Sequence, residues 1–187
     1  MRLAAAAALL LLATCSRKTE PLPVFNTVPA FTLVAQSAQP FESARELAGH
    51  VWIANFIYTS CPGPCPRMSR QMKQLQTALE AEPAIRLVSF TIDPKNDTPD
   101  QLAAYAKRYG ADTARWFFLT GEPEALNKLC REAFMLGTVS GNLDHSTRFV
   151  LVDRQGRVRQ YYDSSDSQSL PALIAAAKAL AHAPANP

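Results

Sequence analysis

Long apolar runs alternate along the chain with segments of helical periodicity. The run VWIANFIY, residues 51–58, has almost no polar side chain, and IRLVSFTI, residues 85–92, repeats this pattern. Strands that are apolar on both faces are typical of a parallel sheet covered by helices. WFFLT, residues 116–120, is predicted to be a third, shorter strand of the same sheet.

Three helices are predicted after these strands, at about residues 66–80, 98–110 and 122–134. The second has the clearest boundaries. Thr98 fits an N-cap followed by a first-turn proline, and Gly110 fits the stop of the helix. Each predicted strand is therefore followed by a helix.

The last part of the chain predicts a hairpin and a closing helix. FVLVD, residues 149–153, and RVRQYYD, residues 157–163, are joined by a short turn that contains Gly156. SLPALIAAAKALAHA, residues 169–183, is the closing helix. Strands that alternate with helices and end in a hairpin and a helix predict an α/β sandwich.

The amino terminus has the pattern of an export signal. Arg2 is followed by an apolar run, residues 3–13, and by small residues before Cys15. A transmembrane helix needs about 20 apolar residues, and the polar residues from Ser16 onward cut this run short. Residues 1–15 are therefore predicted to be a signal peptide.

The end of this signal resembles a bacterial lipoprotein box, in which the chain is cut before a lipidated cysteine. In Leu12-Ala13-Thr14-Cys15, Thr14 departs from the usual Gly, Ala or Ser. Cys15 is the candidate lipidation site. Residues 16–29, SRKTEPLPVFNTVP, are polar and rich in proline, which is typical of a stiff extended tether. Residues 30–187 are then predicted to form the folded domain.

Length, composition and charge narrow the class of protein. The 187 residues, 48% of them hydrophobic, fit one compact domain with a sizeable core. The net charge of +3 is spread along the chain, with no basic run beyond Arg17-Lys18. A nucleic-acid-binding function is set aside because the basic patch that it requires is missing.

The candidate chemistry lies in YTSCPGPCPRMS, residues 58–69. Cys61 and Cys65 stand between a predicted strand and a predicted helix, where open α/β sheets place their functional groups. The start of a helix favours a thiolate there. A structural disulfide closing so small a loop would add little stability. The residues alone leave open a redox pair or two metal ligands, whereas Cys130, on the apolar face of its helix, is interpreted as a buried and inert thiol.

The chain resembles the Sco/SenC family, copper chaperones with a thioredoxin-like fold that act in cytochrome c oxidase assembly. The likeness rests on three segments, NFIYTSCPGPCPRM, TIDPKNDTPDQLAAYAKRYG and LDHSTRFVLVD. It implies a central mixed sheet flanked by helices, and copper bound by the sulfurs of Cys61 and Cys65 and the imidazole of His145. Without the family, His145 is interpreted as a loop histidine about as readily as a ligand.

The donor set suits the implied metal. Soft thiolates favour Cu(I), and an imidazole completes a set that also holds Cu(II). Zinc is the competing metal, but a structural zinc site usually has four protein ligands. Asp93 follows the second predicted strand and Asp144 precedes His145. Each is predicted to be a turn residue or a carboxylate that orients a ligand or tunes the copper.

The resemblance also implies partners and a location. The partners are the copper-bearing subunit of cytochrome c oxidase, with its CuA-type centre, and a second periplasmic copper chaperone. The chain is then expected on the periplasmic side of the bacterial inner membrane, held there by a lipid anchor on Cys15.

Two functions compete for the cysteine pair. The first is a metallochaperone without turnover, and the second is a thiol:disulfide oxidoreductase that acts on cysteines of the oxidase subunit. Thioredoxin-type enzymes carry CxxC, whereas three residues separate Cys61 from Cys65. They also place a cis-proline where this chain has Thr147, and the PxxxTxxC motif of peroxidases is absent from residues 54–61. His145 decides for the chaperone, because a dithiol switch does not need a histidine there.

Overall fold

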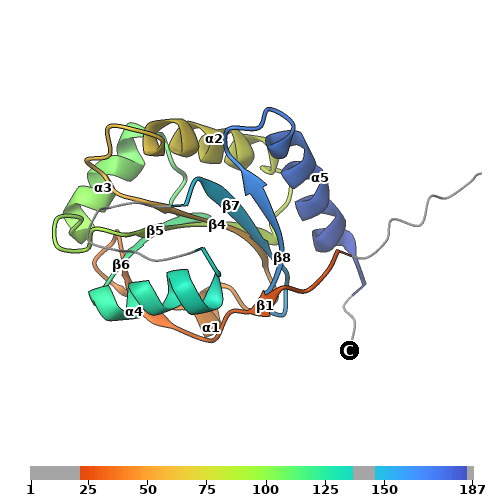
Figure 1. Cartoon of the computed structure of the whole chain (residues 1–187), viewed down its shortest axis with the longest axis horizontal. Coiled ribbons are helices and arrows are strands. Elements are labelled where there is room, and N and C mark those ends of the chain that lie inside the picture. Colours follow the sequence, from red (N-terminus) through yellow and green to blue (C-terminus); the bar gives the residue numbers. More distant parts are fainter. Residues whose placement is uncertain (1–21, 137–145, 185–187) are drawn as a thin grey trace, which may run out of the picture.

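The computed structural model describes residues 22–136 and 146–184. In this part of the chain, eight strands form one mixed sheet in the order β1-β8-β7-β4-β5-β6-β2-β3. Helices cover both faces of the sheet (Figure 1). The predicted α/β sandwich with a central mixed sheet is confirmed.

The strands are β1 (Asn26–Thr27), β2 (Thr32–Ala35), β3 (Pro40–Glu42), β4 (Val51–Ile57), β5 (Ile85–Thr91), β6 (Trp116–Thr120), β7 (Arg148–Val152) and β8 (Arg157–Asp163). The helices are α1 (Ser43–Glu46), α2 (Cys65–Ala78), α3 (Pro99–Arg108), α4 (Pro123–Lys128), which continues as the π-helical turn η1 (Leu129–Ala133), and α5 (Ser169–His182). The predicted elements from residue 51 onward are confirmed, except that the helix predicted at 122–134 changes to π-helical geometry at Leu129.

The centre of the sheet consists of β4, β5 and β6, which run parallel. All seven residues of β4 are buried, as its apolar sequence predicts for a strand covered on both faces. β7 pairs antiparallel with the other side of β4, so that β7 begins at the edge where β4 ends. The carboxyl ends of β4 and β5 and the start of β7 therefore share one edge of the sheet.

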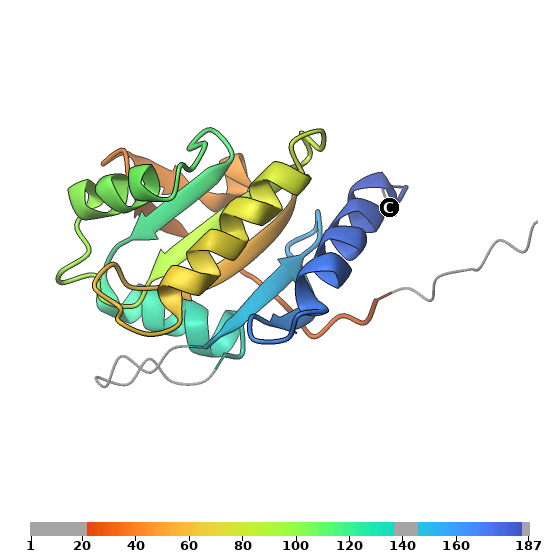
Figure 2. The ribbon, with the colours of Figure 1, turned by 90° about the horizontal axis from the view of Figure 1, so that it is seen from above.

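Two layers of helices enclose the sheet. α2, α3 and α5 lie on one face, and α1 and α4 lie on the other (Figure 1); Figure 2 shows α2 crossing above the strands beside α5. Beneath the first layer, Met68, Met72 and Leu75 of α2 are fully buried. Beneath the second, Phe134 meets Phe56 and Phe90 with ring centroids 5.4 Å apart in both pairs. Both faces of the sheet are thus closed by apolar packing.

The predicted cap and stop of α3 are confirmed. Thr98 Oγ1 accepts a hydrogen bond from the backbone N–H of Gln101 at 3.3 Å. Gly110 has a φ of +61°, the left-handed conformation that commonly ends a helix. The position of α3 matters for the site, because its first residues follow the loop that leaves β5.

The predicted boundary at residue 29 is wrong, because residues 22–29 are already part of the folded domain. β1 pairs antiparallel with β8. Without β1, β8 would be an edge strand with unpaired backbone groups at these positions. Arg159, a buried residue of β8, donates to the carbonyl oxygens of Leu22 and of Pro23, the latter at 2.9 Å. A buried guanidinium needs such acceptors, so this segment docks instead of extending into solvent.

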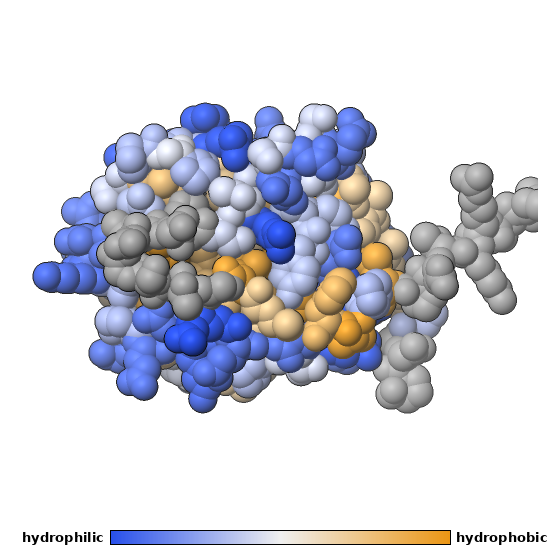
Figure 3. Space-filling model, in the orientation of Figure 1, coloured by the Kyte–Doolittle hydropathy of each residue, from blue (hydrophilic) through white to orange (hydrophobic). Residues whose placement is uncertain are grey.

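Most of the surface drawn in Figure 3 is hydrophilic, with apolar side chains gathered across its middle. Among the described residues, the exposed large apolar side chains are Val24, Phe25 and Met135. The Phe25 ring packs against Tyr161 with centroids 5.3 Å apart. Across residues 22–136 and 146–184, the structure contains no helix with both the length and the apolar character needed to traverse a bilayer.

Candidate metal centre

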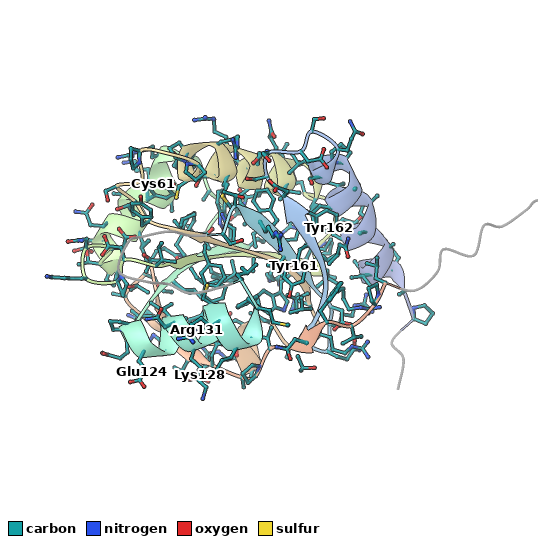
Figure 4. The ribbon with its side chains drawn as sticks, in the orientation of Figure 1. Cys61, Glu124, Lys128, Arg131, Tyr161 and Tyr162 are labelled. Carbon is teal, nitrogen blue, oxygen red and sulfur yellow. The ribbon has the colours of Figure 1, made fainter. Side chains whose placement is uncertain are left out.

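Two cysteines lie where β4 leaves the sheet and α2 begins. Cys61 follows β4 in a turn closed by a hydrogen bond from its N–H to the Tyr58 carbonyl at 3.3 Å. Cys65 is the first residue of α2. Figure 4 shows Cys61 at this end of the sheet, near α2 and α3. Cys61 is 7% exposed and Cys65 is fully buried, so solvent reaches the pair through Cys61.

The thiols of Cys61 and Cys65 are in hydrogen-bond contact. Burial raises the pKa of Cys65 far above its ordinary value, and the hydrogen bond with Cys61 raises this pKa further. The expectation that the helix start would favour a thiolate is therefore wrong for Cys65 in the metal-free pair. Burial disfavours the charged form more strongly than the backbone N–H groups favour it. A bound cation would reverse this balance, because a coordinating thiol is deprotonated.

Tyr58 adds a third polar side chain to the pair. Burial raises the pKa of its hydroxyl, and a hydrogen bond with Cys61 raises this pKa further. Electrostatic interactions with Cys61, Cys65 and Asp93 raise the pKa of Tyr58 as well. The sequence analysis did not select Tyr58, because a tyrosine at the end of an apolar run has no distinguishing pattern.

A buried carboxylate, Asp97, fixes the start of the cysteine loop. Its two oxygens accept hydrogen bonds from the Thr59 N–H at 3.1 and 3.2 Å and from the Thr59 hydroxyl at 2.5 Å. The Thr91 hydroxyl donates to the same carboxylate at 2.5 Å. Because Thr59 follows β4 and Thr91 ends β5, Asp97 links the ends of two neighbouring strands to the loop before α3.

Asp97 was missed by the sequence analysis, which selected Asp93 instead. The structure gives Asp93 the predicted turn role, since its carboxylate accepts from Asn96 Nδ2 at 2.8 and 3.0 Å. Its N–H donates to Thr91 Oγ1 at 2.9 Å. Asp93 thus stands beside the Asp97 network and acts on Tyr58 through its charge. The only sequence signal for Asp97 is that it is the second acidic residue of the loop DPKND, residues 93–97. No local pattern shows that this residue is buried.

The other predicted site residues, Cys15, Asp144 and His145, lie outside the described part of the chain. The chain is described again from Ser146, two residues before β7, at the edge where β4 ends. Among the described residues, no group of three or more His, Cys, Asp or Glu side chains could hold a metal. The structure therefore brings together two sulfurs of the predicted set of three ligands.

Cys130 is confirmed as a separate, buried thiol. It is 3% exposed, and burial raises its pKa to about 11. It packs in the core on the α1 and α4 side of the sheet, whereas Cys61 and Cys65 belong to the core on the opposite side. Cys130 is thus a suitable control for experiments on the pair.

Known proteins are similar to this chain in both sequence and fold. The model of the SCO1/SenC family matches residues 20–181. A protein of Stutzerimonas stutzeri, whose name describes copper binding, is 34% identical over 146 residues, which cover 74% of this chain and 70% of that one.

Two solved structures are also similar. The crystal structure of a SCO1/SenC family lipoprotein from Bacillus anthracis superposes with a TM-score of 0.78 at 30% identity and covers 87% of this chain and 100% of that one. The structure of BsSco, a member of the Sco family of cytochrome c oxidase assembly proteins in which a disulfide switch was identified, gives a TM-score of 0.76 at 30% identity, covering 86% and 96%. The thioredoxin-like fold implied by the sequence is confirmed.

Proposed function

This chain belongs to the SCO1/SenC family. On this basis we propose that it is a copper-binding chaperone. It delivers copper to the CuA-type centre in the copper-bearing subunit of cytochrome c oxidase during assembly of the oxidase. One observation carries the proposal. The thiols of Cys61 and Cys65 touch each other at the end of the sheet, one slightly exposed and the other fully buried. Two adjacent sulfurs form the soft donor pair that Cu(I) prefers.

Copper is the cargo of this site. Cys61 and Cys65 supply two sulfurs, which lose their protons when the metal binds. His145 is proposed as the third ligand. The shared sheet edge supports it, because β7 starts three residues later where β4 ends. Asp93 and Asp144 are proposed to tune the bound copper through hydrogen bonds or charge.

A second candidate function rests on the same thiols. Sulfurs in hydrogen-bond contact are placed to form a disulfide, and BsSco, at 30% identity, contains a disulfide switch. A thiol:disulfide oxidoreductase acting on the oxidase subunit would use Cys61 and Cys65 without a metal. The two functions differ in their need for a nitrogen ligand, so His145 separates them.

The His145→Ala variant is expected to keep Cu(I) to some degree and to weaken Cu(II) binding by at least about tenfold, because even residues that only orient metal ligands contribute 10–100-fold. Cells in which this variant replaces the native protein should then assemble little cytochrome c oxidase at low copper. The measurement is oxidase activity per cell, with immunodetection of the variant to show normal accumulation.

The oxidoreductase predicts a different result for the same cells. Cys61 and Cys65 could still exchange with a target disulfide, so oxidase activity would stay near that of the wild type. If cells with a variant that has lost Cu(II) binding show full oxidase activity at low copper, the chaperone function is refuted and the reductase function is accepted. Added copper should partly restore activity only in the chaperone case.

We also propose that the chain is held on the periplasmic side of the inner membrane by a lipid on Cys15. The family lipoprotein from Bacillus anthracis supports the lipid anchor, and a second periplasmic copper chaperone is the proposed source of the copper. The mature wild-type protein is expected in the detergent phase of a phase partition, and Cys15→Ser is expected to block lipid attachment and to impair processing of the signal peptide. A wild-type protein already in the aqueous phase, with its mature amino terminus elsewhere than residue 15, would exclude the anchor.

A further inference from the structure

A polar pocket of about 430 Å³ opens beside Cys61. Thr59, Ser60 and Cys61 form one wall, and α3 forms the other. The residues from α3 are Gln101, Ala104, Tyr105 and Arg108. Cys65 does not line this pocket and is fully buried. A partner that exchanges copper or electrons with the pair therefore meets Cys61 first, and this pocket is next to it.

The charge of the pocket comes from Arg108. Its guanidinium carbon lies 5.9 Å from the centroid of the Tyr105 ring, a cation–π contact that helps to hold the side chain at the pocket. None of the carboxylates in the described residues forms an ion pair with Arg108. The pocket lining contains no acidic residue. An incoming anion is thus favoured, and Gln101 adds an amide that can donate a hydrogen bond.

The shape of α3 leaves room for a chain to lie along it. Gln101, Ala104 and Arg108 are spaced by three and four residues, so they share one face of the helix. The small Ala104 side chain separates the two polar ones. A peptide lying in this gap could place a carboxylate against Arg108 with its cysteine near Cys61.

We propose that this pocket is the docking site for an acidic, cysteine-bearing segment of the partner, with a partner carboxylate pairing with Arg108 while the partner sulfur meets Cys61. The inference rests on the proposed function only in that the partner presents cysteines to the pair. It adds the kind of segment that is recognised and the residue that recognises it.

The test uses the disulfide form of the full domain and two synthetic peptides, acetyl-Gly-Cys-Glu-Gly-amide and its Gln counterpart. The peptide thiolate attacks Cys61, the Cys61–Cys65 bond breaks, and Cys65 leaves as a thiolate that takes up a proton. A mixed disulfide between the peptide and Cys61 forms, and its rate of appearance is followed by mass spectrometry. Because Cys65 is buried, Cys61 is the sulfur that is attacked.

Arg108 is exposed, so Arg108→Gln is expected to slow the reaction of the Glu peptide by about two- to fivefold, the range for a surface charge pair. The reaction of the Gln peptide should change less than twofold. Arg131→Gln is the matched control, because it removes the same charge from η1, in the layer opposite Cys61 (Figure 4). Ala104→Leu, a substitution at an exposed helix position, should fill the gap and slow both peptides.

Other outcomes would overturn the proposal. Equal rates for the two peptides with the wild-type domain would show that the carboxylate is not recognised. The same fold-change for both peptides in Arg108→Gln would show an effect on the thiols instead of docking. Copper bound per domain, measured on the same variant, should equal that of the wild type. A domain that binds no copper but still prefers the Glu peptide would refute the chaperone and leave the docking site standing.

Discussion

The Asp97→Ala variant is expected to lower the free energy of unfolding by about 3 kcal/mol. The carboxylate is fully buried and accepts bonds from the Thr59 N–H, the Thr59 hydroxyl and the Thr91 hydroxyl. Each buried donor left without an acceptor costs about 1–3 kcal/mol. The loss should be below the full sum, because hydroxyl groups can rotate toward other acceptors. Urea unfolding of the metal-free domain measures the change.

Asp100→Ala is the matched control for this variant. Asp100 is an exposed acidic residue in the first turn of α3, where its charge contributes about 0.3–1 kcal/mol. The free energy of unfolding of Asp97→Asn should lie between those of the two alanine variants. The amide keeps one acceptor oxygen, but its NH₂ group faces the donors of Thr59 and Thr91. An Asp97→Ala domain as stable as Asp100→Ala would contradict the assigned role of the network.

The same network should affect copper. Thr59 stands two residues before Cys61 and is held by Asp97 through both its backbone and its side chain. Without these bonds, the segment that leads to Cys61 loses its attachment to β5. Copper is therefore expected to dissociate faster from Asp97→Ala than from Asp100→Ala, as measured by transfer to a chromogenic chelator.

The second large effect is expected for the Cys61→Ser, Cys65→Ser double variant, which should fall from one bound copper per domain to nearly none. Serine hydroxyls are hard, weakly acidic donors that do not replace thiolates for Cu(I). Removing both sulfurs leaves His145 as the single remaining member of the proposed ligand set. The measurement is copper bound per domain after gel filtration, by atomic absorption.

Cys130→Ser controls for the loss of a thiol as such. Cys130 is buried on the opposite side of the sheet from the pair, so its replacement should leave copper uptake unchanged. Undiminished uptake by the double variant would refute the assignment of both ligands. Circular dichroism of each variant shows whether the fold is kept.

Much of the fold could be predicted because it depends on local patterns. β4 and β5 are apolar enough to identify a sheet that is buried on both faces, and α3 carries a cap and a glycine stop in its own sequence. β1, β2, β3 and α1 were missed. They contain two to four residues each, too few for a periodicity to appear. β1 and β2 are also positioned by pairing with β8 and β6, which are distant in the sequence.

The site could be predicted only in part, for a similar reason. Cys61 and Cys65 stand out because a cysteine pair between a strand and a helix is rare and chemically meaningful. Asp97 looks like any loop aspartate, and only the folded structure shows that it is buried between Thr59 and Thr91. The raised pKa of Cys65 also depends on burial, which the helix position alone does not indicate.

The most direct test of a redox-dependent copper site is the copper content of the wild-type domain, compared between its reduced and disulfide-oxidised forms. Binding needs deprotonated thiols, and a disulfide sulfur is a poor ligand. The reduced domain is expected to hold one copper and the oxidised domain almost none, with binding regained after reduction. Equal copper content in the two forms would contradict the account, since Cys61 and Cys65 would then not be the ligands.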